Sequence, residues 1–108
     1  MAELEVRIAV PSAARRGEVI EIKTLAVHPM EHGFRLDPDG KPIPRKIINA
    51  FFCKYNGELV FAADLHPGMA ANPYLVFHAV ATDSGTLEFT WREDGGDVFV
   101  AERTIVVT

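Results

Sequence analysis

The sequence has little cysteine, fewer basic than acidic residues and no long apolar run, and each shortage argues against a class of protein. Among 108 residues there is one cysteine, Cys53, and 11 Lys and Arg stand against 15 Asp and Glu, for a net charge of -4. One thiol cannot build a disulfide framework. An acidic chain is a poor match for duplex nucleic acid, which requires a basic surface. No segment approaches the roughly 18–20 apolar residues of a membrane-spanning helix. We therefore expect neither nucleic acid nor membrane as a partner.

The remaining composition is that of an ordinary folded domain. Hydrophobic residues make up 48% and charged residues 24% of the chain, a balance that argues against intrinsic disorder. Domains typically run to about 100–150 residues, so residues 1–108 are expected to form a single domain. The first seven residues have neither the basic nor the apolar region of a secretory signal, which taken alone predicts a cytoplasmic protein.

Short extended segments, separated by turn signals about every ten residues, fill most of the chain. Leu87, Phe89 and Trp91 alternate with polar residues, the period of two expected for a strand with one face in the core. Asn-Gly at 56–57 and the acidic glycine run at 93–97 predict hairpin turns. Seven such strands without a helical stripe predict an all-β fold, an immunoglobulin-like antiparallel β-sandwich. The expected strands are residues 4–10, 18–27, 47–55, 59–63, 74–80, 86–91 and 98–107.

The second expected strand is irregular in its apolar pattern. Its two isoleucines, at 20 and 22, share one face, whereas Leu25 and Val27 fall on the other. This change of face predicts a β-bulge near Thr24. The next segment, residues 28–44, holds four prolines and is long for a structureless loop, and loops of that length are often functional.

Several expected strands carry apolar residues on both faces. Phe51 and Phe52 are consecutive, so one of them must point away from the core that the other joins. The same holds for Val98 with Phe99 and for residues 105–107. Either a partner chain covers the outer apolar face or the protein's own loops do, and the pattern leaves both open. Phe51 and Phe52 are therefore a candidate apolar interface strand.

Histidines are the candidate metal ligands. His28 and His32 are four residues apart, but Pro29 and Gly33 argue against the helix that would bring them together. A metal site would need His66 as a third ligand. The corresponding alternative function is a free-standing sandwich that binds a metal or a small ligand through these three histidines.

The sequence offers no catalytic constellation. Cys53 lies in an apolar strand and is expected to be a small buried hydrophobe rather than a nucleophile. No serine has the surroundings of a nucleophile elbow, and no glycine-rich loop precedes a helix. We expect no enzyme activity, no catalytic residue and no cofactor.

One segment resembles a known family. Residues 28–35 are similar to the H-P-M-E-T/S-G-x-R signature of SoxZ, the smaller subunit of the SoxYZ sulfur-carrier complex of bacterial thiosulfate oxidation. The likeness continues in order through 39–44, Asn-Gly at 56–57, 72–77 and the closing hairpin after Trp91. The chain departs from the pattern at His32, where a small hydroxyl residue is common, and at 70–71, where two alanines stand. The signature residues proposed to act are His28, Pro29, Met30, His32, Gly33 and Arg35.

The resemblance implies a non-catalytic subunit that forms a heterodimer with a SoxY-like protein. That partner carries the sulfur intermediates on a cysteine near the end of a glycine-rich C-terminal segment and meets the other Sox enzymes transiently. The hypothesis is that 28–35 lies at the partner surface or where that segment docks; the alternative is that it only braces a long loop. Without its partner the chain is expected to self-associate. The resemblance also replaces the cytoplasmic expectation by a periplasmic one, with export on a partner that bears a twin-arginine signal.

Overall fold

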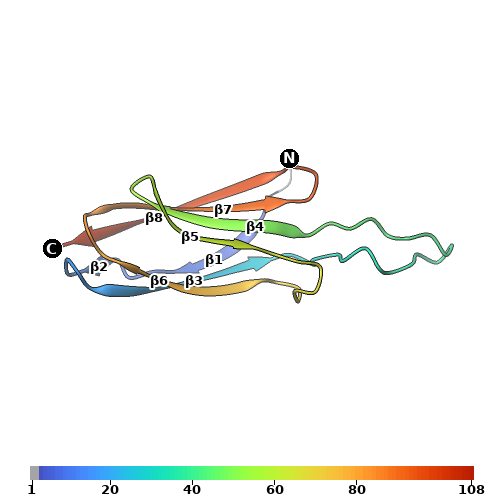
Figure 1. Ribbon diagram of the computed structural model, residues 1–108, viewed down its shortest axis with the longest axis horizontal. Helices are drawn as coiled ribbons and strands as arrows, with labels where there is room; N and C mark the ends of the chain where they lie inside the picture. Colours follow the sequence, from blue (N-terminus) through green and yellow to red (C-terminus); the bar gives the residue numbers. More distant parts are fainter. Residues whose placement is uncertain (1–2) are drawn as a thin grey trace.

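The computed structural model describes residues 3–108 as two β-sheets packed face to face (Figure 1). One sheet has the order β1-β3-β6 and the other β2-β8-β7-β4-β5. This is the expected immunoglobulin-like sandwich, with eight strands rather than seven. The strands are β1 (Glu5–Ala9), β2 (Ala13–Ala14), β3 (Val19–Val27), β4 (Ile48–Tyr55), β5 (Glu58–Asp64), β6 (Tyr74–Val80), β7 (Gly85–Glu93) and β8 (Val98–Val107). Among residues 3–108 we find no helix that is long and apolar enough to cross a membrane.

The additional strand, β2, is two residues long and passes the chain from one sheet to the other. β1 pairs antiparallel with β3, whereas β2 pairs parallel with the end of β8 in the opposite sheet. The N-H groups of Val106 and Thr108 donate to the carbonyls of Ser12 and Ala14 at 3.0 Å each. The first segment of the chain thus contributes to both sheets, which a strand prediction from apolar alternation alone did not reveal.

The expected bulge near Thr24 is wrong. Pairing of β3 is unbroken from Val19 to Val27, with β1 on one side and β6 on the other. Thr24 and Ala26 continue the buried face, while Leu25 and Val27 lie outward. Leu25 and Val27 therefore lie on the face opposite the two isoleucines, as expected, but on a regular strand without a bulge. The register shifts lie instead in β4, against β5 and against β7.

The turn between β4 and β5 forms as the sequence predicts. Asn56 and Gly57 have φ of 49° and 85°, and a type I′ turn requires positive φ at both central positions. Residues 94–97 close the β7–β8 hairpin with a longer loop, in which Gly95 and Gly96 have φ of 95° and 96° and the Gly96 N-H donates to the Glu93 carbonyl at 3.0 Å.

Aromatic rings from both sheets meet at Phe51 in the middle of the sandwich. Its ring centroid lies 5.2 Å from Trp91, 5.9 Å from Phe77 and 6.1 Å from Phe61. Phe61 of β5 also stacks on Phe77 of β6 at 4.3 Å, joining the outer strands of the two sheets. Rings at these separations attract one another in addition to the apolar area they bury. Phe51 is fully buried, as one of the two consecutive phenylalanines had to be.

Residues 28–46 form a projecting segment, which we call the hairpin arm. It extends from one end of the sandwich, opposite the end where the C-terminus lies (Figure 1). Isolated bridges pair Glu31 with Lys46 and Leu36 with Pro42, so the two limbs of the arm run antiparallel. Asp37 closes its tip by accepting the N-H groups of Asp39 and Lys41 at 2.9 Å. The molecule measures 60 × 25 × 19 Å.

Phe51 and Phe52 offer a matched test of the core. Phe51→Ala should lower the free energy of unfolding by about 3–5 kcal/mol, because it removes the ring that touches both sheets. Phe52→Ala, one residue away on the outer face, should cost about 1 kcal/mol. Guanidinium unfolding followed by circular dichroism measures both values. Equal losses would show that the two faces of β4 are not distinguished as described.

Candidate functional site

The signature segment is divided between the interior and the surface. His28 and Met30 are buried, His32 is half-buried, and Pro29 and Arg35 are exposed. The Met30 sulfur accepts the N-H of Ile48 at 3.3 Å, and Met30 itself has a φ of 53°. The segment therefore braces the arm with one set of residues and presents another to solvent. Whether the exposed set meets a partner stays a prediction.

His28 joins three segments that are far apart in the sequence. Its Nδ1 accepts the N-H of Met30 at 2.9 Å, so the ring proton is on Nε2, which donates to Oε2 of Glu93 at 2.6 Å. Its backbone N-H donates to Oδ1 of Asn72 at 2.9 Å, and the Asn72 N-H returns a bond to the His28 carbonyl at 2.8 Å. The ends of β3 and β7 and the β5–β6 loop are thus held together.

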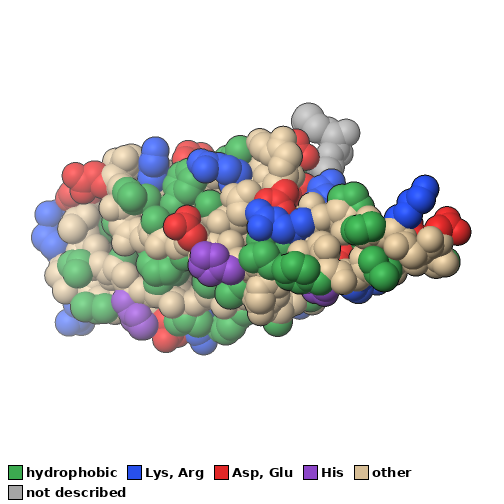
Figure 2. Space-filling model, turned by 45° about the vertical axis from the view of Figure 1, so that its right-hand side comes forward, with side chains coloured by type: hydrophobic (Ala, Val, Ile, Leu, Met, Phe, Trp, Pro, Cys, Tyr) green, Lys and Arg blue, Asp and Glu red, His purple; other side chains and the backbone are tan. Residues whose placement is uncertain are grey.

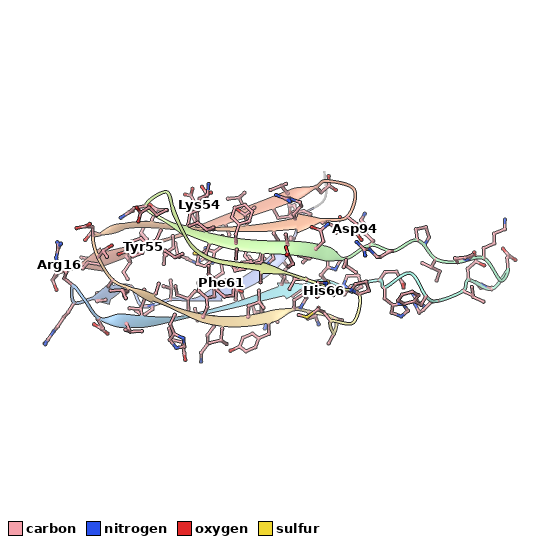
Figure 3. The ribbon with its side chains drawn as sticks, viewed as in Figure 1. Arg16, Lys54, Tyr55, Phe61, His66 and Asp94 are labelled. Carbon is pink, nitrogen blue, oxygen red and sulfur yellow. The ribbon has the colours of Figure 1, made fainter. Side chains whose placement is uncertain are left out.

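Asp94 fastens the other limb of the arm to the sandwich (Figure 3). Its carboxylate accepts two bonds from the Arg45 guanidinium, both 2.8 Å, and single bonds from the Ile47 N-H and the Asn49 amide, both 3.1 Å. The hydrogen bonds from Arg45, above all, hold the pKa of the Asp94 carboxyl well below its usual range. Bidentate pairs of this kind fix orientation as well as distance.

The two limbs of the arm approach closely at Gly33. Gly33 has a φ of +87°, and a Cβ added there would lie 2.9 Å from Cβ of Arg45. Only glycine fits both the backbone conformation and the space. On the same limb, Arg35 forms an ion pair with Glu31, which lowers the pKa of that carboxyl. The Arg35 guanidinium is thus already engaged within the arm.

Two large apolar side chains are exposed on the arm. Phe34 is 80% exposed and Leu36 63% exposed. Phe34 stacks on His32 at 5.3 Å, and its N-H donates to His32 Nδ1 at 2.9 Å, so the ring is held in place although solvent surrounds it. Hydrophobic side chains on the projecting part of the surface are visible in Figure 2. Neither residue was predicted from the sequence, although apolar residues inside a proline-rich, charged loop were the available signal.

Phe52 lies on the outside of the five-stranded sheet. It pairs with Ala62 on β5 and with Thr90 on β7, and Thr90 pairs with Val100 on β8. Residues directly opposite each other share a face, so these four form a continuous row, which we call the outer apolar row. Ala62 and Val100 are exposed, Phe52 is half-buried and Thr90 is buried. Val98, which is exposed, extends the row on β8. The expectation that one phenylalanine faces away from the core is confirmed.

The three histidines of the alternative function do not form a metal site. Both ring nitrogens of His28 are engaged in hydrogen bonds, and His66 is exposed in the β5–β6 loop (Figure 3). Within residues 3–108, no group of three or more His, Cys, Asp or Glu side chains is placed to hold a metal ion. The geometry does not support the metal-binding alternative.

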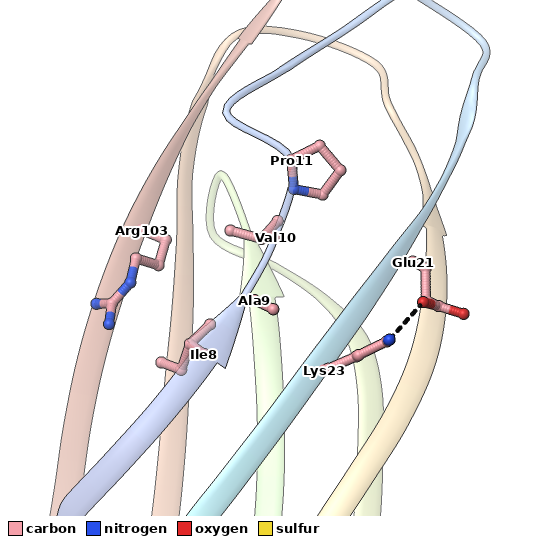
Figure 4. Close-up of a pocket in the computed structure, with 7 residues that line it drawn as sticks. All are labelled: Ile8, Ala9, Val10, Pro11, Glu21, Lys23 and Arg103. Atoms are coloured by element: carbon pink, nitrogen blue, oxygen red, sulfur yellow. Dashed lines mark ion pairs between the residues drawn. The ribbon is translucent and has the colours of Figure 1, made fainter.

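A hollow of about 390 Å³ lies beside the C-terminal end of β1 (Figure 4). Ile8, Val10, Pro11 and the stem of Arg103 form part of its wall. Its lysine, Lys23, pairs with Glu21 at 3.4 Å, and Arg103 donates to a backbone carbonyl at 2.7 Å. Its charged groups are thus already partnered, which leaves this hollow without a reactive arrangement.

Asp94→Asn tests how the arm is attached. The variant should lose about 2 kcal/mol of unfolding free energy at neutral pH, because the charge-assisted bonds are weakened. A depressed carboxyl pKa stabilises the fold above the ordinary value of 3.8 and ceases to do so as the pH falls below it. Wild type should therefore lose more stability than Asp94→Asn between about pH 5 and about pH 2. Asp97→Asn in the same turn is the control; parallel pH profiles for wild type and Asp94→Asn would contradict the assignment.

The Cys53 thiol should react very slowly in the folded protein. Its side chain is buried, and burial, with a smaller effect of the Glu88 charge, raises the pKa of the thiol to about 12. At about pH 8 the thiol should react with a disulfide reagent at least about 100-fold more slowly than in the denatured chain. Absorbance of the released thiolate measures both rates. Fast reaction in the native state would show an accessible thiol.

Comparison with known proteins identifies the family. The family model described as sulphur oxidation protein SoxZ matches residues 6–104, nearly the whole chain. A search of curated protein sequences found no match.

Solved structures share the sandwich at low identity. A superoxide reductase (neelaredoxin) from Ignicoccus hospitalis is 17% identical with a TM-score of 0.75, over 99% of this chain and 83% of that one. The sulfur carrier protein SoxY from Chlorobium limicola f thiosulfatophilum is 16% identical with a TM-score of 0.66, over 95% and 78%. A CARDB domain from Pyrococcus furiosus, in complex with di-metal ions, is 14% identical with a TM-score of 0.52, over 98% and 94%. These likenesses show the fold alone. Because the SoxZ model spans nearly all of the chain, the protein belongs to the SoxZ family of sulphur oxidation proteins.

Proposed function

We propose that this chain is a non-catalytic subunit that pairs with a SoxY-like protein to form the carrier of covalently bound sulfur intermediates in thiosulfate oxidation. The observation that carries the proposal is the SoxZ family match over residues 6–104. The partner supplies the sulfur-bearing cysteine. The buried Cys53, with its raised pKa, supports this division of roles because a buried thiol cannot accept a sulfur group from another enzyme.

Two surfaces of the chain are suited to a protein partner. In the outer apolar row Val98 and Val100 are exposed and Phe52 is half-buried, and exposed apolar patches on folded domains commonly mark interaction sites. The hairpin arm presents Phe34 and Leu36 on a backbone held by Asp94 and Gly33. A segment that is already rigid loses little conformational freedom on binding, which favours affinity.

The polar groups of the signature segment would add specificity. His32 and Arg35 lie beside Phe34 on the arm, and Arg35 can exchange its bond to Glu31 for one to an anionic group of the partner or of its carried sulfonate. We assign to these residues contact with the partner or with its carrier segment. His28 and Met30 act indirectly, by fixing the base of the arm.

The family resemblance also suggests the setting in which the chain works. We propose transient encounters of the heterodimer with other Sox enzymes and a periplasmic location reached in complex with a twin-arginine-bearing partner. Without the partner, the uncovered apolar surface should promote self-association.

Co-expression with a SoxY-like protein from the same source tests the proposal. We expect a stable one-to-one complex by size exclusion with light scattering, and self-association of the isolated chain. Leu36→Ser and Phe34→Ser should each weaken the complex by about tenfold or more, and Arg35→Ala should lower affinity or carrier turnover. Val19→Ser is the matched control, because Val19 is 63% exposed at the start of β3 in the other sheet and lies outside both proposed surfaces. An isolated chain that stays monomeric and does not bind the SoxY-like protein would overturn the proposed function.

A further inference from the structure

A hollow of about 470 Å³ opens where the hairpin arm leaves the sandwich. Its walls come from five regions: the residues before β1, the end of β3, the hairpin arm, the end of β7 and the start of β8. Leu4, Val27, Ile43 and Phe99 give it apolar sides. The buried carboxylate of Glu93 also lines it, so the hollow combines apolar walls with a buried charged group.

One oxygen of Glu93 has no hydrogen-bond donor among residues 3–108. The residue is 5% exposed; its Oε2 accepts the bond from His28 Nε2 at 2.6 Å, while Oε1 is buried and unpartnered. The Lys46 ammonium approaches Oε1 to 3.6 Å, close enough for charge attraction but beyond hydrogen-bond distance, and its side chain is 62% exposed. A buried carboxylate oxygen without a donor is costly. The site is therefore incomplete as it stands and calls for a donor.

The charges around the hollow favour a positive occupant. Glu3 and Glu31 line it together with Glu93, against the single ammonium of Lys46. Glu31 is already paired with Arg35. The buried carboxylate of Glu93 is therefore the one with an oxygen that accepts no hydrogen bond from residues 3–108. A cation with an aliphatic stem complements both the apolar walls and this carboxylate.

We propose that this hollow binds a basic side chain, arginine or lysine, presented by a partner protein. The stem of that side chain packs against Val27, Ile43 and Phe99, and its cationic head donates to Oε1 of Glu93 in place of Lys46. A free amino acid fits less well, because its own carboxylate would approach Glu3 and Glu31. The hollow is built from residues of this chain alone, so the proposal stands whether or not the partner is a SoxY-like protein.

The site is tested with two probes, a capped arginine and an uncharged analogue of the same shape. The full chain, labelled with ¹⁵N, is titrated with N-acetyl-arginine N-methylamide and followed by amide chemical shifts. We expect saturable shifts at Val27, Ile43 and Phe99. The citrulline analogue, in which a urea replaces the guanidinium, should bind at least about tenfold more weakly, because a neutral donor gains less from a carboxylate. Free arginine should also bind more weakly than the capped form.

Variants of the two charged residues should shift the affinity in opposite directions. Glu93→Gln should weaken binding of the capped arginine by about tenfold and abolish its advantage over the citrulline analogue. Lys46→Met should strengthen binding by about threefold or more, because the competing ammonium is gone. Lys23→Met is the matched control: Lys23 is likewise ion-paired, to Glu21 at 3.4 Å, but lies outside the hollow.

Three results would contradict binding of a basic side chain in this hollow. Equal binding of the arginine and citrulline probes to wild type, or no change in Lys46→Met, would overturn it. Shifts confined to residues outside the hollow would do the same. Dispersed amide spectra verify that each variant is folded, and if Glu93→Gln does not fold, the probe pair and Lys46→Met still decide.

Discussion

The hydrogen bond between the His28 ring and the Glu93 carboxylate determines where the hairpin arm leaves the sandwich. It connects the end of β3 in one sheet with the end of β7 in the other, across 65 positions of sequence. Both groups are buried, and a buried polar group that loses its partner is costly. The bond is made from the Nε2-H tautomer that the Met30 N-H selects. The first turn of the arm and the closure of the two sheets therefore depend on the same imidazole.

The parts of the fold that the sequence predicted are those set by local chemistry. Alternation at Leu87, Phe89 and Trp91 indicated the buried face of β7, and the Asn-Gly pair indicated the turn after β4. The bulge expected near Thr24 was wrong because burial there follows the opposing sheet rather than side-chain polarity, so that Thr24 is buried and Leu25 lies outward on a regular strand. β2 was missed because two alanines carry no periodic signal and form a strand only through pairing with β8.

The site was harder to predict than the fold because its bonds span the sequence. The signature segment was found from the residues, but its anchors, Glu93 and Asp94, read as turn residues after β7 until the structure placed them against His28 and Arg45. Because these partners are far away in the sequence, the sequence alone did not show which residues of 28–35 are buried and which are exposed. Pro29 and Gly33 indicated a turn, whereas the burial of Met30 depends on Ile48.

The sandwich itself does not distinguish the protein from its structural neighbours, since superoxide reductases and a SoxY protein adopt it at 17% identity or below. What is particular to a chain of this fold lies on its ends and faces. The arm and the C-terminus lie at opposite ends of a body 60 Å long (Figure 1). A tether placed at Thr108 would consequently orient every molecule on a sensor surface with its arm directed into solution, so that attachment and recognition do not compete for the same end.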